Sequence, residues 1–150
     1  MIHSKIIKKI SLLLFFCTLC ITGSASYILI PMDDSQHNHL KAYGIAYYAI
    51  EQDLKVDWLL NYQGGSFMIK YNNTIKSECN IRGVSFNIIA DIQSTHILKS
   101  IASPSVNQDV VRLEKAPRIA IYSPKSNQPW DDAVTMALTY AETPYEIVYD

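Results

Sequence analysis

The side chains best suited to ligand binding gather in one polar segment, residues 123–132. Lys125, Gln128, Trp130 and Asp131 provide a cation, an amide, an aromatic plate and a carboxylate close together in the sequence. Such a set suits a sugar or another small polar ligand. The alternative is structural, because an acid in the first turn of a helix interacts favourably with the helix dipole, and a tryptophan can pack as a lid on a sheet edge. The sequence leaves both interpretations open.

Asp33 is a second candidate for ligand binding. It lies in segment 32–35, directly after an apolar run that we expect to be a strand. Segment 123–132 follows another such run, and open α/β sheets bind ligands beyond the carboxyl ends of their strands. The sequence therefore predicts ligand contacts from both loops. Asp33, Asp34 and Ser35 are also suitable caps for the helix that follows.

Other motifs that carry catalysis or bind metals are weak in this sequence. Gly64 and Gly65 follow an expected strand but open no helix, so they fit a hairpin turn better than a phosphate loop. No Gly-x-Ser-x-Gly or Gly-x-Cys-x-Gly elbow occurs. His37 and His39 lie two residues apart, which on a helix directs the two rings away from each other. The sequence predicts no catalytic residue, no metal ligand and no cofactor.

The first 26 residues have the pattern of an export signal. Three lysines precede the apolar stretch 10–21, and small residues follow at 24–26, as a signal peptidase requires. The apolar stretch is shorter than the roughly 20 residues of a membrane span, so we expect cleavage after Ser26. The mature domain, residues 27–150, is then expected in the periplasm or on the surface of a Gram-negative bacterium. Its only membrane contact would be through the signal before cleavage.

Charge and cysteine content narrow the possible partners. The chain has 13 basic and 14 acidic residues, and loss of the signal removes three lysines, leaving 10 basic residues and a net charge of −4. No block of Lys and Arg survives, which argues against a nucleic-acid partner. Cys79 would be the last cysteine, and neither Glu78 nor Asn80 offers a cation to activate it. We expect Cys79 to be a buried apolar side chain rather than a nucleophile.

The alternation of apolar runs with amphipathic segments predicts an α/β fold. The expected arrangement is a three-layer, flavodoxin-like open sheet, mostly parallel, with one antiparallel hairpin around Gly64 and Gly65. The sheet is expected to be incomplete, because the sequence stops just after a strand. Residues 72–73 are expected to form a turn and 106–115 a connector. We expect strands at 27–31, 56–62, 66–71, 81–89, 118–122 and 145–149, and helices at 40–52, 92–101 and 129–143.

The helix at 40–52 is expected to pack on the sheet through its large apolar side chains. Leu40, Tyr43, Tyr47 and Ile50 recur at helical spacing on one face. Gly44 lowers helix stability by roughly 1 kcal/mol relative to alanine, and close packing onto the sheet would explain its presence.

Several segments together resemble one family of exported bacterial proteins, those often catalogued as asparagine synthetase B. The resemblance covers nearly all of the mature chain and implies a fold similar to class I glutamine amidotransferases, in a longer protein of which this is the N-terminal part. It transfers no catalytic residue, because Ile2 stands where asparagine synthesis needs a cysteine and the Ser-Gly-Gly-x-Asp-Ser loop is absent. The segments are Leu29-Ile-Pro-Met-Asp33, His39-Leu-Lys-Ala-Tyr-Gly-Ile-Ala-Tyr47, Val56-Asp-Trp-Leu-Leu-Asn-Tyr-Gln-Gly-Gly-Ser-Phe67, Lys115-Ala-Pro-Arg-Ile-Ala-Ile-Tyr-Ser-Pro124 and Gln128-Pro-Trp-Asp-Asp-Ala-Val-Thr135.

Two functions remain open on the sequence. The first is an exported α/β module without a catalytic centre, which binds a small polar ligand or a protein partner at the strand ends near Trp130. The second is a fragment of a hydrolase or amidotransferase whose nucleophile lies beyond Asp150. Whether the protein is an enzyme is not decided by these residues.

Overall fold

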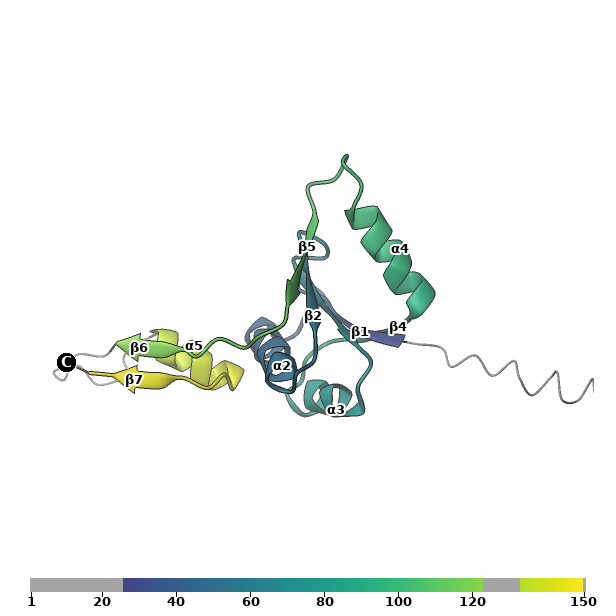
Figure 1. The fold of residues 1–150 in the computed structure, drawn as a ribbon. Helices are drawn as coiled ribbons and strands as arrows, with labels where there is room; N and C mark the ends of the chain where they lie inside the picture. Colours follow the sequence, from purple (N-terminus) through teal and green to yellow (C-terminus); the bar gives the residue numbers. More distant parts are fainter. Residues whose placement is uncertain (1–25, 123–132, 150) are drawn as a thin grey trace, which may run out of the picture.

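The computed structural model describes residues 26–122 and 133–149, which form helices and two separate β-sheets (Figure 1). The expected export signal, residues 1–25 of it, and the polar segment 123–132 lie outside the described residues. No helix among the described residues is long and apolar enough to cross a membrane. The elements in chain order are β1 (Ser26–Ile30), α2 (His39–Glu51), β2 (Val56–Leu60), β3 (Ser66–Lys70), α3 (Asn73–Ile81), β4 (Asn87–Ala90), α4 (Asp91–Ile101), β5 (Asp109–Leu113), β6 (Ala120–Tyr122), α5 (Ala133–Ala141) and β7 (Glu146–Val148).

The larger sheet has the strand order β4-β1-β3-β2-β5 and is antiparallel at every neighbouring pair. The prediction of a mostly parallel open sheet, whether flavodoxin-like or amidotransferase-like, is therefore wrong. β1 and β2 do run in the same direction, but β3 lies between them and pairs with both. The cause is the short β2–β3 turn, which brings the chain back antiparallel to β2. β3 therefore occupies the position beside β2 that a parallel β1 would need.

The β2–β3 turn requires its glycines. Gly64 and Gly65 have φ angles of 75° and 96°, in the left-handed region that glycine adopts at little cost. A Cβ atom on Gly64 would lie 2.3 Å from the carbonyl oxygen of Met32. The backbone N–H of Met32 in turn donates to the carbonyl oxygen of Gln63 at 2.9 Å. The predicted hairpin is confirmed, and its turn is fastened to the loop that follows β1.

Helices cover both faces of the larger sheet (Figure 1). Side chains alternate along a strand, so Ile28 and Ile30 belong to the core under α2 and α3, while Leu29 packs on the other face with Ile101 of α4. Cys79 of α3 is fully buried in the first core, as predicted. The central strands are thus apolar on both sides.

Two elements of the larger sheet region were not predicted. The expected turn at 72–73 is the start of α3, where the Asn72 side chain accepts hydrogen bonds from the backbone N–H groups of Thr74 and Ile75. The expected strand at 81–89 is shortened to β4, because α3 extends to Ile81. Segment 106–115, expected to be a connector, contains β5, which pairs with the whole of β2 as an edge strand.

α2 packs on the sheet through Ile45, Ile50 and several small side chains rather than through all four of the residues that were predicted. Of the four residues predicted to form its packing face, Ile50 is buried, whereas Leu40 and Tyr43 are 43% and 49% exposed. Small side chains let the helix lie close to the strands and fill the interface densely. Tyr43 and Tyr47, which lie on another side of α2, line a cavity. The residues buried instead are Ala42, Gly44, Ile45, Ala46 and Ala49.

The C-terminal part of the chain forms a separate β6–α5–β7 unit. Its strands and helix lie where predicted, and β6 pairs with β7 in parallel, with Ile121 opposite Ile147. The unit does not join the larger sheet, however, and contacts the rest of the molecule through α5 against α2 (Figure 1). Gly44 marks the closest approach, because a Cβ atom there would lie 1.8 Å from the carbonyl oxygen of Ala141. The expectation that Gly44 packs onto the sheet is wrong.

Candidate ligand-binding pocket

The structure describes one of the five predicted site residues. Lys125, Gln128, Trp130 and Asp131 lie outside the described residues, so the predicted site near Trp130 stays a prediction. Asp33 is part of the loop after β1.

The Asp33 carboxylate forms a local turn. It accepts hydrogen bonds from the hydroxyl and the backbone N–H of Ser35, and these bonds lower the pKa of Asp33. The N-cap of α2 is Asn38, whose side chain accepts from the backbone N–H of Lys41 at 3.2 Å, rather than any of residues 33–35. Asp33 does not line the pocket described next.

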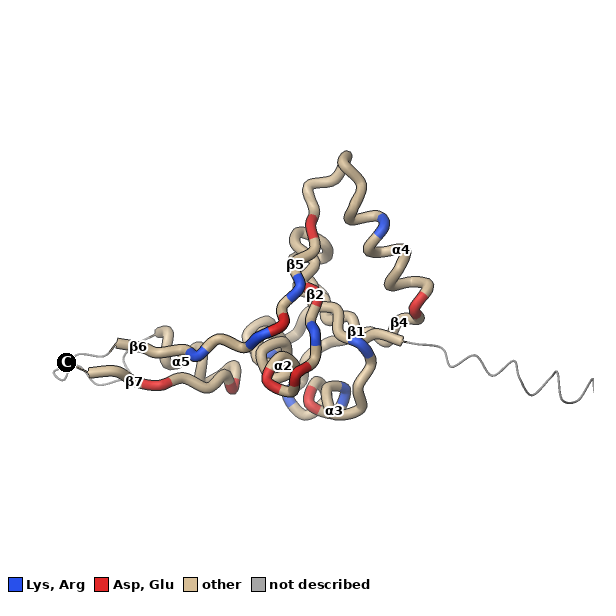
Figure 2. The backbone as a smooth tube through the Cα atoms, in the orientation of Figure 1, with Lys and Arg blue, Asp and Glu red and all other residues tan. Residues whose placement is uncertain are grey.

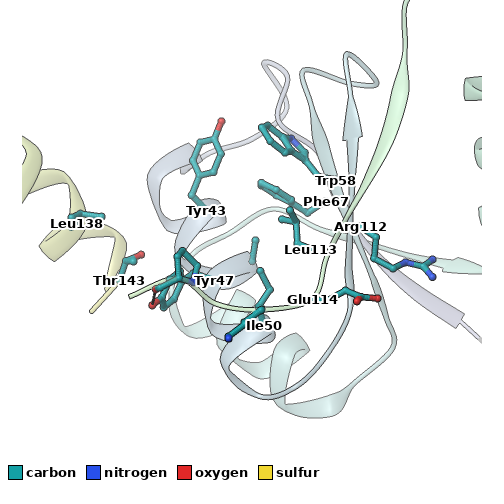
Figure 3. Close-up of a pocket in the computed structure, with 13 residues that line it drawn as sticks. Tyr43, Tyr47, Ile50, Trp58, Phe67, Arg112, Leu113, Glu114, Leu138 and Thr143 are labelled. Carbon is teal, nitrogen blue, oxygen red and sulfur yellow. Dashed lines mark hydrogen bonds between the residues drawn. The ribbon is translucent and has the colours of Figure 1, made fainter. Parts of the chain in front are cut away.

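A pocket of about 570 Å³ lies between α2, the β2–β5 side of the larger sheet, the linker 114–119 and the end of α5 (Figure 3). Apolar side chains form much of its surface, from Ile50 of α2, Leu113 of β5 and Leu138 of α5. The pocket therefore joins residues from segments far apart in the sequence.

Four aromatic side chains form one wall of the pocket. The ring of Phe67, 2% exposed, stacks with that of Trp58 at a centroid distance of 6.2 Å and meets the edge of Tyr43 at 5.5 Å. Trp58 Nε1 donates to the carbonyl oxygen of Gly65 at 3.1 Å. These contacts hold the rings in fixed positions, so the wall is organised before any ligand binds.

Tyr47 completes the aromatic wall and holds the linker. Its hydroxyl donates to the carbonyl oxygen of Pro117 at 2.7 Å. Burial raises the pKa of Tyr47, and the nearby carboxylate of Glu51 raises it further. The phenol therefore stays protonated and keeps this hydrogen bond at neutral and mildly alkaline pH.

The charged residues at the rim differ in their partners. Arg112 donates to both carboxylate oxygens of Asp57, at 2.8 and 3.3 Å, and this hydrogen bonding raises the pKa of Arg112. Glu114 pairs with Lys55 at 3.1 Å. Lys115 has no hydrogen bond or ion pair with any of the described residues. Both basic and acidic residues occur along β5 and the linker (Figure 2), and Lys115 is the charge at the rim that no described residue compensates.

Two hydroxyl groups of the pocket are also without a hydrogen bond to any of the described residues. One belongs to Tyr43, which is 49% exposed. The other belongs to Thr143, which is only 8% exposed and whose side chain is directed toward α2 across the pocket (Figure 3). Solvent reaches the Thr143 hydroxyl, because within the described residues Arg82 Nη1 is the side-chain nitrogen or oxygen that is buried without a hydrogen bond. Both hydroxyls can therefore bond to water or to a ligand.

The side chains most often used in catalysis do not meet in this part of the structure. Burial raises the pKa of the Cys79 thiol to about 12, so the thiolate is not formed at neutral pH. His37 is exposed, and Nε2 of His39 lies 3.2 Å from the carbonyl oxygen of Met32. Within residues 26–122 and 133–149, no group of three or more His, Cys, Asp or Glu side chains is placed to hold a metal ion.

Sequence reasoning missed the pocket residues because each had an ordinary structural role. Tyr43 and Tyr47 were predicted to pack on the sheet, and Trp58 and Phe67 were treated as strand residues of the hairpin. The available signal was on α2, where alanines already provide a complete packing face beside the two tyrosines. Large aromatic side chains that the core does not need are a reason to expect a binding surface.

No protein-family model, curated protein or solved structure gives a significant match to this chain. The function of the chain is therefore inferred from the geometry of the pocket.

Proposed function

We propose that this chain is a ligand-binding module, and that the aromatic pocket binds a small molecule with a flat apolar ring system and an acidic group. The pocket itself is the observation that carries the proposal. Its volume of about 570 Å³ lies within the roughly 300–1,000 Å³ typical of small-molecule sites, and its lining combines apolar walls with a few polar groups.

The ring system is inferred from the fixed aromatic wall. Trp58 and Tyr43, held in place by the buried ring of Phe67, offer stacking and edge contacts, which favour planar ligands by roughly 0.5–1.5 kcal/mol per ring pair beyond the area buried. A sugar fits less well, because the polar atoms of Trp58 and Tyr47 are already bonded within the protein. Few groups remain to receive the hydroxyls of a sugar.

The acidic group is inferred from the rim. Lys115 is the rim charge without a partner among the described residues, while Arg112 and Glu114 are each compensated. An anionic group beside Lys115 would gain a favourable interaction, and the Thr143 hydroxyl could donate to a second polar atom of the ligand.

We also propose that the module acts outside the cytoplasm, on the basis of the export signal expected in residues 1–26. The resemblance to the exported family catalogued as asparagine synthetase B stays a prediction, as does a polar site near Trp130. No catalytic step is proposed for the residues described.

The test uses two fluorescent probes that share one ring system. 1-Anilinonaphthalene-8-sulfonate carries an acidic group, whereas N-phenyl-1-naphthylamine is uncharged. We expect saturable binding of the sulfonate to the purified protein, with a change in Trp58 fluorescence measured in a Trp130→Phe background. Tyr43→Ala should weaken the binding of both probes about two- to tenfold, since one ring contact is lost.

Lys115→Met should weaken only the anionic probe, by about fivefold, the value of a surface charge interaction of about 1 kcal/mol. The matched controls are Lys99→Met on α4 and Tyr149→Ala after β7, both exposed and outside the pocket. They should leave both affinities unchanged. Non-saturable binding of the sulfonate would refute the proposed site. Equal effects of the Lys115 and Lys99 variants would refute the acidic group of the ligand.

A further inference from the structure

The pocket is assembled from two parts of the fold (Figure 3). Tyr43, Trp58 and Phe67 belong to the larger sheet and its covering helix α2, whereas Leu138 and Thr143 belong to the β6–α5–β7 unit. The linker 114–119 joins the two parts. The pocket therefore has all its walls only while the β6–α5–β7 unit is docked on α2.

A group of polar contacts outside the pocket holds the unit in this position. Lys41 of α2 forms an ion pair with Glu142, the residue directly after α5. The ammonium group of Lys41 also lies 5.0 Å from the ring centroid of Tyr140. Asn38 donates to the Tyr140 hydroxyl at 2.9 Å. α5 carries no charged residue between 133 and 141 (Figure 2), so the charge that binds it to α2 is that of Glu142.

Arg82, at the end of α3, adds a second cation for Glu142. Its side chain is only 8% exposed, and Nε contacts carboxylate oxygens of Glu78 at 2.9 Å and of Glu142 at 3.2 Å. Nη1 is buried without a hydrogen bond, and the guanidinium carbon lies 5.4 Å from the ring centroid of Tyr48. A buried guanidinium with an unsatisfied nitrogen gains strongly from each carboxylate nearby. Docking of Glu142 supplies the second one.

The backbone of Glu142 adopts a conformation that glutamate does not favour. Its φ angle is 56°, in the left-handed region, where helices usually end in glycine or asparagine. A glutamate is strained there, and such strain is maintained where the surrounding contacts outweigh it. Those contacts are Lys41 and Arg82.

We infer that Glu142 is a positioning residue for the pocket, and that ligand binding and docking of the β6–α5–β7 unit are thermodynamically linked. This inference rests on the proposed ligand pocket. The Lys41–Glu142–Arg82 cluster touches no ligand, but it sets the fraction of molecules in which the pocket is complete. A ligand that contacts both parts stabilises the docked form in return.

The size of the effect follows from the docked fraction. The apparent dissociation constant equals the intrinsic constant divided by the fraction of molecules that are competent to bind. A loss of docking to between a third and a tenth of the molecules therefore raises the apparent dissociation constant about three- to tenfold. The intrinsic contacts of the ligand with the pocket are unchanged.

The test compares Glu142→Gln with Glu146→Gln. Both remove one exposed carboxylate from an ion pair, but Glu146 pairs with Arg118 inside the unit and does not bridge to α2. Docking is measured without ligand as the rate of tryptic cleavage after Lys115, an exposed linker residue that forms no ion pair with the described residues. Binding is measured with 1-anilinonaphthalene-8-sulfonate. We expect faster cleavage and about three- to tenfold weaker binding for Glu142→Gln, and wild-type values for Glu146→Gln.

A rescue experiment separates positioning from damage to the pocket. Asn38→Cys and Tyr140→Cys place two thiols across the docking contact, and a short bis-maleimide joins them, while Cys79 is buried with a raised pKa and does not react. Cross-linking should restore probe affinity in the Glu142→Gln background, with the uncross-linked protein as control. If cross-linking fails to restore affinity, or if Glu142→Gln cleaves faster yet binds normally, the linkage is wrong. If wild type binds no probe, the proposed function fails and the linkage with it, while cleavage alone still decides whether Glu142 holds the unit.

Discussion

Substitution of Gly44 by alanine should have two opposite effects: it should stabilise α2 and weaken the contact of α2 with α5. In an isolated helix, Gly44→Ala would stabilise α2 by roughly 1 kcal/mol. In the folded protein, the new Cβ atom would lie 1.8 Å from the carbonyl oxygen of Ala141, where ordinary contact begins at 3.4 Å. α5 must therefore move away by about 1.6 Å, the difference between these two values, because a backbone carbonyl cannot rotate aside.

A displacement of this size should undock the β6–α5–β7 unit. Overpacking typically costs roughly 1–3 kcal/mol, which corresponds to a factor of about 5–150 in the docking equilibrium. The larger sheet and α2 are spared, and their melting temperature should stay constant or rise by up to roughly 8 °C through the gain in helix propensity. We expect faster tryptic cleavage after Lys115 and weaker probe binding in a protein whose sheet is at least as stable as that of wild type.

Thermal unfolding followed by circular dichroism, together with linker proteolysis, measures the two effects separately. Gly83→Ala is the matched control, because its φ of 66° makes alanine strained while no atom lies within 4 Å of the added Cβ. It should lower the melting temperature without changing cleavage of the linker. If Gly44→Ala leaves both linker cleavage and probe affinity at wild-type values, the close packing of α2 against α5 is wrong.

Two further predictions concern charge. The hydrogen bond from Lys41, followed by the positive charges of Arg82 and Lys41, lowers the pKa of Glu142 below its ordinary value of 4.5. A lowered pKa contributes stability that is fully present above the unfolded value and is lost as pH falls through the folded value. The affinity of wild type for the probe should therefore fall as pH drops below about 4.5. Glu142→Gln should lack this loss of affinity, and identical acid profiles of the two proteins would contradict the role of Glu142. Arg112→Met should destabilise the protein by roughly 1–3 kcal/mol in urea unfolding, because the Asp57 side chain, 11% exposed, loses its bidentate partner. Adding Asp57→Asn should recover part of this loss. If Arg112→Met alone is as stable as wild type, the Arg112–Asp57 pair does not stabilise the fold.

Local features of the fold were predictable because short-range interactions decide them. The paired glycines at 64–65 determine a tight hairpin, since left-handed φ angles are accessible there. The positions of α2, α5, β6 and β7 followed from apolar spacing and, for the last three, from flanking prolines, although β6 begins two residues after the predicted start and the predicted start of the last helix, residue 129, lies outside the described residues. Burial of Cys79 followed from its apolar character and from the absence of a cation at Glu78 and Asn80.

The direction of the sheet was not predictable from the same patterns. The strand–helix–strand order of 27–62 led us to expect a parallel sheet, and a continuous apolar run such as Ile28-Leu29-Ile30 is typical of parallel strands. The structure shows that such a run reports burial on both faces, by α2 and α3 on one side and α4 on the other. Two-sided burial does not depend on whether neighbouring strands are parallel or antiparallel.

The sequence by itself determined most of the strands and helices, though not α3 or β5, as well as where the hairpin turns and that Cys79 is buried, because each of these depends on residues close together in the chain. Only the tertiary structure decided that β3 lies between β1 and β2, that α2 presents Tyr43 and Tyr47 to a pocket, and that Glu142 meets Lys41 and Arg82. These choices depend on contacts between segments tens of residues apart, and such contacts have no signature in local periodicity, since several pairings bury the same apolar surface.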